Sequence, residues 1–254
     1  MINNNILTSN DFMFAPYNPG IGIDSGALYL ATSKTNPQIQ YVIKSEYPEL
    51  ACNEFMYHKV AESVGLHMQA VKLFQGIKEK EYATGIRFSP NARKFDHKTA
   101  TEENIRDFYA FHSLYVILNE EDSQEFYIDE QERVFKLDNA ASFNMSSTIA
   151  ISLAADKKKI NSNVKALIQS SLNYIEYNKY RLMMELLIKN YGQESRSAYL
   201  EMFERFVEFD ESVLDEAYGS LDIIYPNWLS DYYCEFIYIR KAECRRFLRE
   251  VGGL

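Results

Sequence analysis

The strongest constraint on the fold is the uneven placement of proline and glycine along the chain. Five of the six prolines lie within the first 90 residues, and no proline occurs between Pro90 and Pro226. Glycine is likewise missing between Gly85 and Gly192. Because both residues interrupt regular elements, the front of the chain is predicted to form short strands and turns, and the back long helices. The switch near residue 90 predicts a small β-rich lobe followed by a larger helical lobe.

The composition excludes two broad classes of protein. Of the 254 residues, 46% are apolar and 25% are charged, which is enough apolar material for a core and too much for a disordered chain. The formal net charge of −9 argues against extensive nucleic-acid binding, because proteins that cover a phosphate backbone are normally basic. We therefore expect a globular protein, in which a local anion site stays possible.

The cysteines and the lack of long apolar runs indicate the cellular compartment in which we expect the protein. Cys52, Cys234 and Cys244 are scattered and form no CxxC motif, so no disulfide framework fits. This pattern is typical of a reducing cytoplasm. The N-terminal stretch lacks a basic segment followed by an apolar one, and no apolar run reaches the ~18 residues of a membrane span. We expect a cytoplasmic protein with no signal peptide and no membrane contact.

Hydrophobic spacing predicts the elements of the front half. A helix is expected to open at Pro48 and to end at Gly65, which is suited to the left-handed position after a helix. Alternation and turn residues predict the strands around it, which cover residues 28–30, 41–44, 68–74 and 81–88. The predicted order is therefore strand, strand, helix, strand, strand.

The back half is predicted to be mostly helical, with one hairpin. A helix is expected over 101–118, and two short strands over 126–128 and 134–137. Beyond Asp156 three helices are expected, each with one apolar face. The residues of these faces are Val164, Leu167, Ile168, Leu172 and Ile175; then Tyr199, Met202, Phe203 and Phe206; then, from near Pro226, Tyr232, Phe236 and Ile239.

Two charged residues in the front half form a candidate pair. Lys44 ends an apolar strand and can point its ammonium into a cleft, where it would meet phosphates. Glu54 follows on the next helix, and kinases hold such a lysine with a helical glutamate. Each has an ordinary alternative: a lysine that extends to water and a solvated helical glutamate. Taken singly, the ordinary alternative is favoured for both.

Two further acidic features follow in the back half. Asp138 stands where an apolar strand runs into Asp-Asn-Ala-Ala, a place suited to holding Mg²⁺ against phosphates; a turn-forming Asp-Asn pair is the alternative. The segment from Asn119 to Glu125 follows an apolar helix and could supply a catalytic base. Because residues 119–133 contain seven acids and one base, a solvated acidic loop is the alternative there. The four histidines show no metal-ligand spacing and are expected at the surface.

The order of these features resembles the HipA-like kinases. The strand YVIK at 41–44 is similar to their VVKF strand, and NEFM with AESVGL over 53–66 to their "NE" helix. FYAFHSL over 108–114, running on to Asn119, resembles the helix before their catalytic loop. LDNAASF at 137–143 resembles their "DNG.SF" metal motif, and IYPNW followed by Arg240 resembles the tail of the small members. Larger members carry an extra N-terminal domain, which we do not expect in this chain.

This resemblance implies a bilobal protein-kinase-like α+β fold, with an N-lobe over residues 1–88 and a C-lobe over 89–254. It implies ATP-dependent phosphorylation of a Ser/Thr hydroxyl in an unidentified protein, with Mg-ATP between the lobes. Lys44 would contact the α- and β-phosphates, and Glu54 would orient Lys44. Asp138 would hold Mg²⁺, and Asp122, or Glu121 next to it, would accept the hydroxyl proton.

The chain also departs from the family pattern. The arginine and asparagine of the family's catalytic loop have no clear counterpart, and Glu125 or Gln124 would have to supply the second oxygen ligand. The phosphate loop would come from the glycine-rich stretch that contains Gly22, Ser25 and Gly26. A catalytically impaired kinase-fold module that binds a partner protein is therefore the first alternative. An unrelated interaction protein, in which the four features coincide by chance, is the second.

Overall fold

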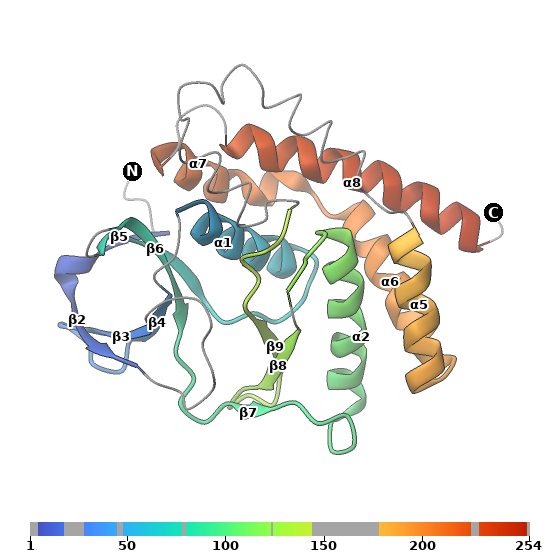
Figure 1. Cartoon of the computed structure of the whole chain (residues 1–254), viewed down its shortest axis with the longest axis horizontal. Helices are drawn as coiled ribbons and strands as arrows, with labels where there is room; N and C mark the ends of the chain where they lie inside the picture. Colours follow the sequence, from blue (N-terminus) through green and yellow to red (C-terminus); the bar gives the residue numbers. More distant parts are fainter. Residues whose placement is uncertain are drawn as a thin grey trace.

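The first third of the chain forms a curled six-stranded sheet (Figure 1). The computed structural model describes residues 5–17, 28–44, 48–77, 80–122, 124–143, 178–224 and 229–252. The strands are β1 (Ile6–Thr8), β2 (Phe12–Pro16), β3 (Leu28–Ser33), β4 (Gln40–Lys44), β5 (Val71–Ile77) and β6 (Lys80–Arg87), and a short 3-10 turn, η1 (Ser9–Asp11), joins the first two. The order is β1-β5-β6-β4-β3-β2, in which only β1 and β5 pair in parallel.

Residue alternation on β4 decides which way Lys44 faces. Tyr41 and Ile43 are buried in an apolar cluster on one face of the sheet, so Lys44 projects to the other face. It pairs in register with Thr84 of β6, and directly paired residues share a face. The Thr84 hydroxyl donates a 2.7 Å hydrogen bond to the carbonyl of Ala51. Lys44 therefore lies on the side of the sheet that the next helix covers.

That helix is α1 (Pro48–Ser63), which is buried on almost every side. It packs on β5 and β6 and also contacts α7 of the C-terminal half. Its last turn is closed by Gly65, whose φ is +83°, and by the amide of Leu66, which donates to the carbonyl of Ala61 at 2.9 Å. A residue at positive φ after a helix is where glycine is favoured, so the expected end of this helix is confirmed.

The rest of the described chain is a small sheet and a set of helices. β7 (Arg93–Lys94), β8 (Glu125–Ile128) and β9 (Val134–Leu137) form an antiparallel three-stranded sheet. The helices are α2 (Glu102–Ile117), α5 (Asn178–Tyr191), α6 (Glu194–Glu208), α7 (Asp215–Ile224) and α8 (Leu229–Gly252), with a 3-10 turn η2 (Glu211–Leu214) before α7. α2 packs against α5 and α6, and α8 packs against α6 and α7.

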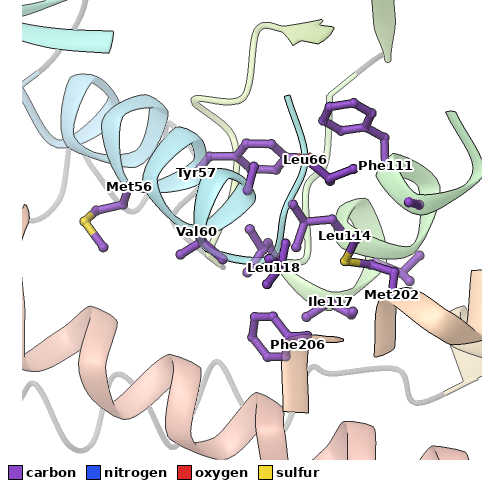
Figure 2. Close-up of a cluster of buried hydrophobic side chains, with 14 of the residues drawn as sticks. Met56, Tyr57, Val60, Leu66, Phe111, Leu114, Ile117, Leu118, Met202 and Phe206 are labelled. Carbon is purple, nitrogen blue, oxygen red and sulfur yellow. The ribbon is translucent and has the colours of Figure 1, made fainter. Parts of the chain in front are cut away.

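One apolar core joins the two halves. Figure 2 shows Tyr57 and Val60 of α1 on the side of the helix that faces Leu114 of α2 and Phe206 of α6, while Met56 points away from them. A second, smaller cluster lies on the face of the large sheet that carries Tyr41 and Ile43. Since α1 contributes to the larger cluster, it is fixed to the C-terminal helices as well as to the sheet.

Most expected elements are confirmed, and some were missed. The predictions did not include β1, β2, β7 or α7, which are short or lack a clean apolar period. The helical face expected at 164–175 lies outside the described residues, and the lobe boundary at 88 and 89 stays a prediction. Among the described helices, none combines the length and apolar character that crossing a membrane requires.

Candidate functional site

An ion pair joins the end of β4 to the residue that follows β9. Nζ of Lys44 lies 2.5 Å from Oδ1 of Asp138, although the two residues are 94 positions apart in the sequence. The lysine side chain is 21% exposed and the aspartate side chain 41%. Both charges therefore remain accessible to a ligand. Asp138 also has a φ of 62°, a left-handed conformation that costs free energy for a residue other than glycine.

Glu54 of α1 lies buried beside this pair. Its carboxylate accepts hydrogen bonds from the backbone amide of Asn139 at 2.6 Å and from the Asn139 side-chain amide at 2.9 Å. Nε2 of His58 lies 3.0 Å from the same carboxylate. Burial by itself would raise the pKa of Glu54. The hydrogen bond and charge of His58, the charge of Lys44 and the bond from Asn139 outweigh burial and lower it to about 2.

The loop from Asp138 to Phe143 is tied down at several points. The side-chain amide of Asn53 donates to the carbonyls of Ala140 at 2.8 Å and Ser142 at 3.1 Å. The Tyr233 hydroxyl of α8 donates to the Asn53 side-chain oxygen at 2.5 Å. Since Asn53 is fully buried, these bonds satisfy polar groups that water cannot reach. The loop is thus held between α1 and α8.

The expected catalytic loop lies against this tied loop. The amide of Glu121 donates to the carbonyl of Ala141 at 3.0 Å. Glu121 and Asp122 are exposed, whereas Glu120 is buried and forms an ion pair with Lys136 of β9. Burial raises the pKa of Glu120, whereas the charge of Lys136 and its hydrogen bond favour the ionised carboxylate and oppose the rise. The negative charge of Asp122 contributes to the same rise, so Asp122 lies near Glu120.

Strained backbone concentrates in these two loops. Within the described chain, four residues other than glycine have positive φ, and three of them are Asn119 at 49°, Asp138 at 62° and Phe143 at 60°. A bulky residue such as phenylalanine is strongly disfavoured there. The Phe143 amide donates to the carbonyl of Leu118 at 2.7 Å, which helps to hold this conformation. Such strain persists where the surroundings enforce it, and it clusters at functional sites.

The fit of the site to a divalent metal is limited. Asp138 offers a partly exposed carboxylate, and Glu125 begins β8 opposite Leu137, at the same end of the small sheet. Glu125 also accepts a 3.0 Å hydrogen bond from the Tyr127 hydroxyl. Across the described ranges, no group of three or more His, Cys, Asp or Glu side chains could hold a metal ion. This set fits Mg²⁺ only in its usual form, with one or two carboxylates and the rest of its ligands from phosphates and water.

The structure brings together the predicted residues Lys44, Glu54 and Asp138. Lys44 forms an ion pair with Asp138, and the carboxylate of Glu54 is bonded to Asn139 and His58. The expected orienting of Lys44 by Glu54 stays a prediction. Glu121 and Asp122 lie on the neighbouring loop, and Glu125 lies on β8. The expected phosphate-loop residues Gly22, Ser25 and Gly26 fall outside the described residues.

One expectation about the histidines is wrong, and several buried polar residues were missed. His58 is fully buried rather than at the surface, because Glu54 and the carbonyl of Gln69 supply partners for its ring. Its position four residues after Glu54 on one helix was the signal that could have found it. Asn53 and Asn139 show no signal beyond the motif they belong to. Lys136, a lysine inside a four-residue apolar strand, was a weak signal of a buried charge.

Comparison with known proteins gives the fold. No protein-family model matches the chain, and no curated protein matches it. Among solved structures, the chain is similar to a proinflammatory kinase of Helicobacter pylori, CtkA, with a TM-score of 0.54 and 12% sequence identity over 92% of each chain. At this identity the likeness concerns the fold. The chain therefore has a mixed α+β, bilobal kinase-like fold, with a curled N-terminal sheet and a helical C-terminal part.

Proposed function

We propose that this protein is a HipA-like protein kinase that transfers the γ-phosphoryl group of ATP to a Ser/Thr hydroxyl of another protein. The observation that carries the proposal is the 2.5 Å pair between Lys44 and Asp138. In a kinase-like fold, a lysine at a strand end next to a carboxylate at the mouth of another strand forms the phosphate- and metal-binding pair. The strained backbone at Asp138 adds support.

The residues of the site take distinct roles in this proposal. Lys44 binds the α- and β-phosphates as a point charge, and Asp138, with Glu125, holds Mg²⁺. Bound Mg²⁺ would neutralise charge on the β- and γ-phosphates. Glu54 keeps Asn139, and hence the backbone next to Asp138, in place through its two accepted hydrogen bonds. Gly22, Ser25 and Gly26 belong to the proposed phosphate loop.

Asp122 orients the attacking hydroxyl and accepts its proton, and Glu121 is the neighbouring candidate for this role. In the transfer step, the hydroxyl oxygen forms a bond to the γ-phosphorus while the bond from that phosphorus to the bridging oxygen breaks. ADP leaves with the bridging electron pair, and the hydroxyl proton passes to the carboxylate. Asp122 is exposed, so a protein substrate can reach it.

Phosphoryl transfer from radiolabelled ATP tests the proposal. We expect label on the protein itself, with Ser25 as one expected position, or on a protein of a cell extract. Asp122→Ala is expected to abolish transfer while circular dichroism and nucleotide binding stay unchanged. If transfer survives in Asp122→Ala and is lost in Glu121→Ala, the base is Glu121. A wild-type protein that binds Mg-ATP but transfers nothing over hours would overturn the enzymatic proposal.

A kinase-fold module that binds a partner protein without catalysis is the second candidate. It is favoured by the way the expected catalytic loop departs from the kinase pattern. Kinases normally hold two Mg²⁺ ions with an aspartate and an asparagine, and Asn119, the asparagine of the loop over 119–122, already accepts a 3.1 Å hydrogen bond from Lys179 through its side-chain oxygen. Mg-ATP binding without transfer is the result that this candidate predicts.

A further inference from the structure

A buried ion pair lies beneath the proposed catalytic loop. Lys136 of β9 and Glu120 both have fully buried side chains, with 0% exposure, and they pair directly. Lys136 also donates a 2.7 Å hydrogen bond to the side-chain oxygen of Asn139, and its Nζ lies 5.4 Å from the centre of the Tyr57 ring. A lysine is almost never fully buried unless it is paired, so this arrangement depends on both partners.

The pair completes a hydrogen-bonded path between three parts of the site. Glu54 of α1 accepts from the backbone and side chain of Asn139. The side-chain oxygen of Asn139 accepts from Lys136, and Lys136 pairs with Glu120. The path therefore runs from the helix beside Lys44, through the residue after Asp138, to the loop that bears the proposed base.

Two backbone bonds run parallel to this path. Glu121 donates to the carbonyl of Ala141, and Phe143 donates to the carbonyl of Leu118. Lys136 connects the same two loops through side chains, because it bonds to Glu120 in one loop and to Asn139 in the other. Because Glu120 stands directly before Glu121, a shift of its side chain moves the backbone of the proposed base relative to Asp138.

We infer that Lys136 is a positioning residue for phosphoryl transfer, which fixes the loop of Asp122 and Glu121 relative to Asp138 through its pair with Glu120. The inference rests on the proposed function for its catalytic part. Stability alone does not explain the pair, because a buried ion pair is often no more stabilising than apolar residues of similar volume. Positioning does explain it, since misplacing reacting groups by about 1 Å can cost ~100-fold in rate.

Lys136→Met tests the inference, with Lys241→Met as a matched control. Lys241 is also a buried lysine, paired with Glu211 at 3.1 Å, but it lies in α8 against the segment after α6. We expect Lys136→Met to lower kcat by about 100-fold and to change the Kd for Mg-ATP by less than about threefold. Lys241→Met is expected to leave both unchanged. Unchanged kcat in Lys136→Met, or an equal loss in both variants, overturns the inference.

A second measurement does not depend on activity. Hydrogen exchange of the Glu121 and Phe143 amides is expected to speed up at least about tenfold in Lys136→Met, and not in Lys241→Met, at matched global stability. If the wild type transfers no phosphate, the proposed function fails. The exchange measurement still decides whether the Lys136–Glu120 pair holds the two loops together. Equal exchange in the two variants overturns the inference even for an active enzyme.

A substitution of Glu120, the partner of Lys136, tests the same pair without changing the lysine. Glu120→Gln keeps the size of the side chain and removes its charge, and it is expected to produce the same loss of kcat and of amide protection. The double variant with Lys136→Met should lose no more than either single variant, because residues that act as a pair are not additive. Additive losses would show that the two residues act separately. If Lys136→Met fails to fold, Glu120→Gln alone carries both measurements.

Discussion

The buried carboxylate of Glu54 makes a quantitative prediction about acid stability. Its pKa falls from 4.5 to about 2 in the folded protein, and each pKa unit corresponds to about 1.4 kcal/mol. The ionised carboxylate therefore contributes about 3 kcal/mol to the free energy of unfolding at neutral pH. Because the pKa is lowered in the folded state, this contribution is complete above about pH 4.5 and is lost as the pH falls toward 2.

Glu54→Gln is the perturbation that exposes this contribution. Glutamine has the same size but one accepting oxygen, so its NH₂ group would face one of the two N–H donors of Asn139. We expect the free energy of unfolding of the variant to be about 3 kcal/mol below that of the wild type at pH 7, and only about 1 kcal/mol below it near pH 3. The control Glu204→Gln, at an exposed position of α6, is expected to change stability by less than about 0.5 kcal/mol.

Urea unfolding followed by far-UV circular dichroism, from pH 7 down to about pH 3, measures these differences. The slope of the free energy with urea concentration should match between the proteins, which shows that the same surface is exposed. A difference that stays constant across this pH range would refute the link to ionisation. A loss of less than about 1 kcal/mol at pH 7 would show that the hydrogen bonds to Glu54 do not offset its burial.

Two further substitutions test the site and the sheet. Asp138→Asn keeps the size of the side chain and removes its charge. We expect calorimetry to show that the Mg-dependent affinity for ATP falls at least tenfold, which is about 1.4 kcal/mol. Unchanged affinity would mean that Asp138 is a turn residue only. Gly85→Ala adds a methyl group that would meet the Phe74 ring and lie 2.7 Å from Cδ1 of Ile43. Thermal unfolding is expected to show a loss of about 1–3 kcal/mol from overpacking, and a neutral result would show that the sheet can open at this point.

The sequence predicts the elements that carry the site better than it predicts the contacts within it. A strand that ends in Lys44, a helix that ends before Gly65 and a strand that runs into Asp138 all follow from local spacing and turn chemistry. These features depend on neighbours within a few residues. Short strands such as β1 and β2 depend instead on pairing with β5 and β3, which local patterns do not contain.

The buried polar network was beyond local reasoning for a physical reason. The partners Lys136 and Glu120 are 16 positions apart and meet only because β9 passes beneath the loop. By composition, Glu120 belongs to an acidic run that looks solvated, and the exposed residues Glu121 and Asp122 fit that description. Tertiary packing places the first acid of the run inside and the next two outside, a distinction that residue type alone does not make.

Calorimetric titration with Mg-ATP measures directly whether Lys44 and Asp138 form a nucleotide site. We expect saturable binding to the wild type, weaker binding when EDTA removes the metal, and a rise in melting temperature that grows with ligand concentration. ADP with Mg²⁺ should also bind, since Lys44 is expected to contact the α- and β-phosphates. No heat of binding and no shift in melting temperature at millimolar Mg-ATP would show that Lys44 and Asp138 do not form a nucleotide site.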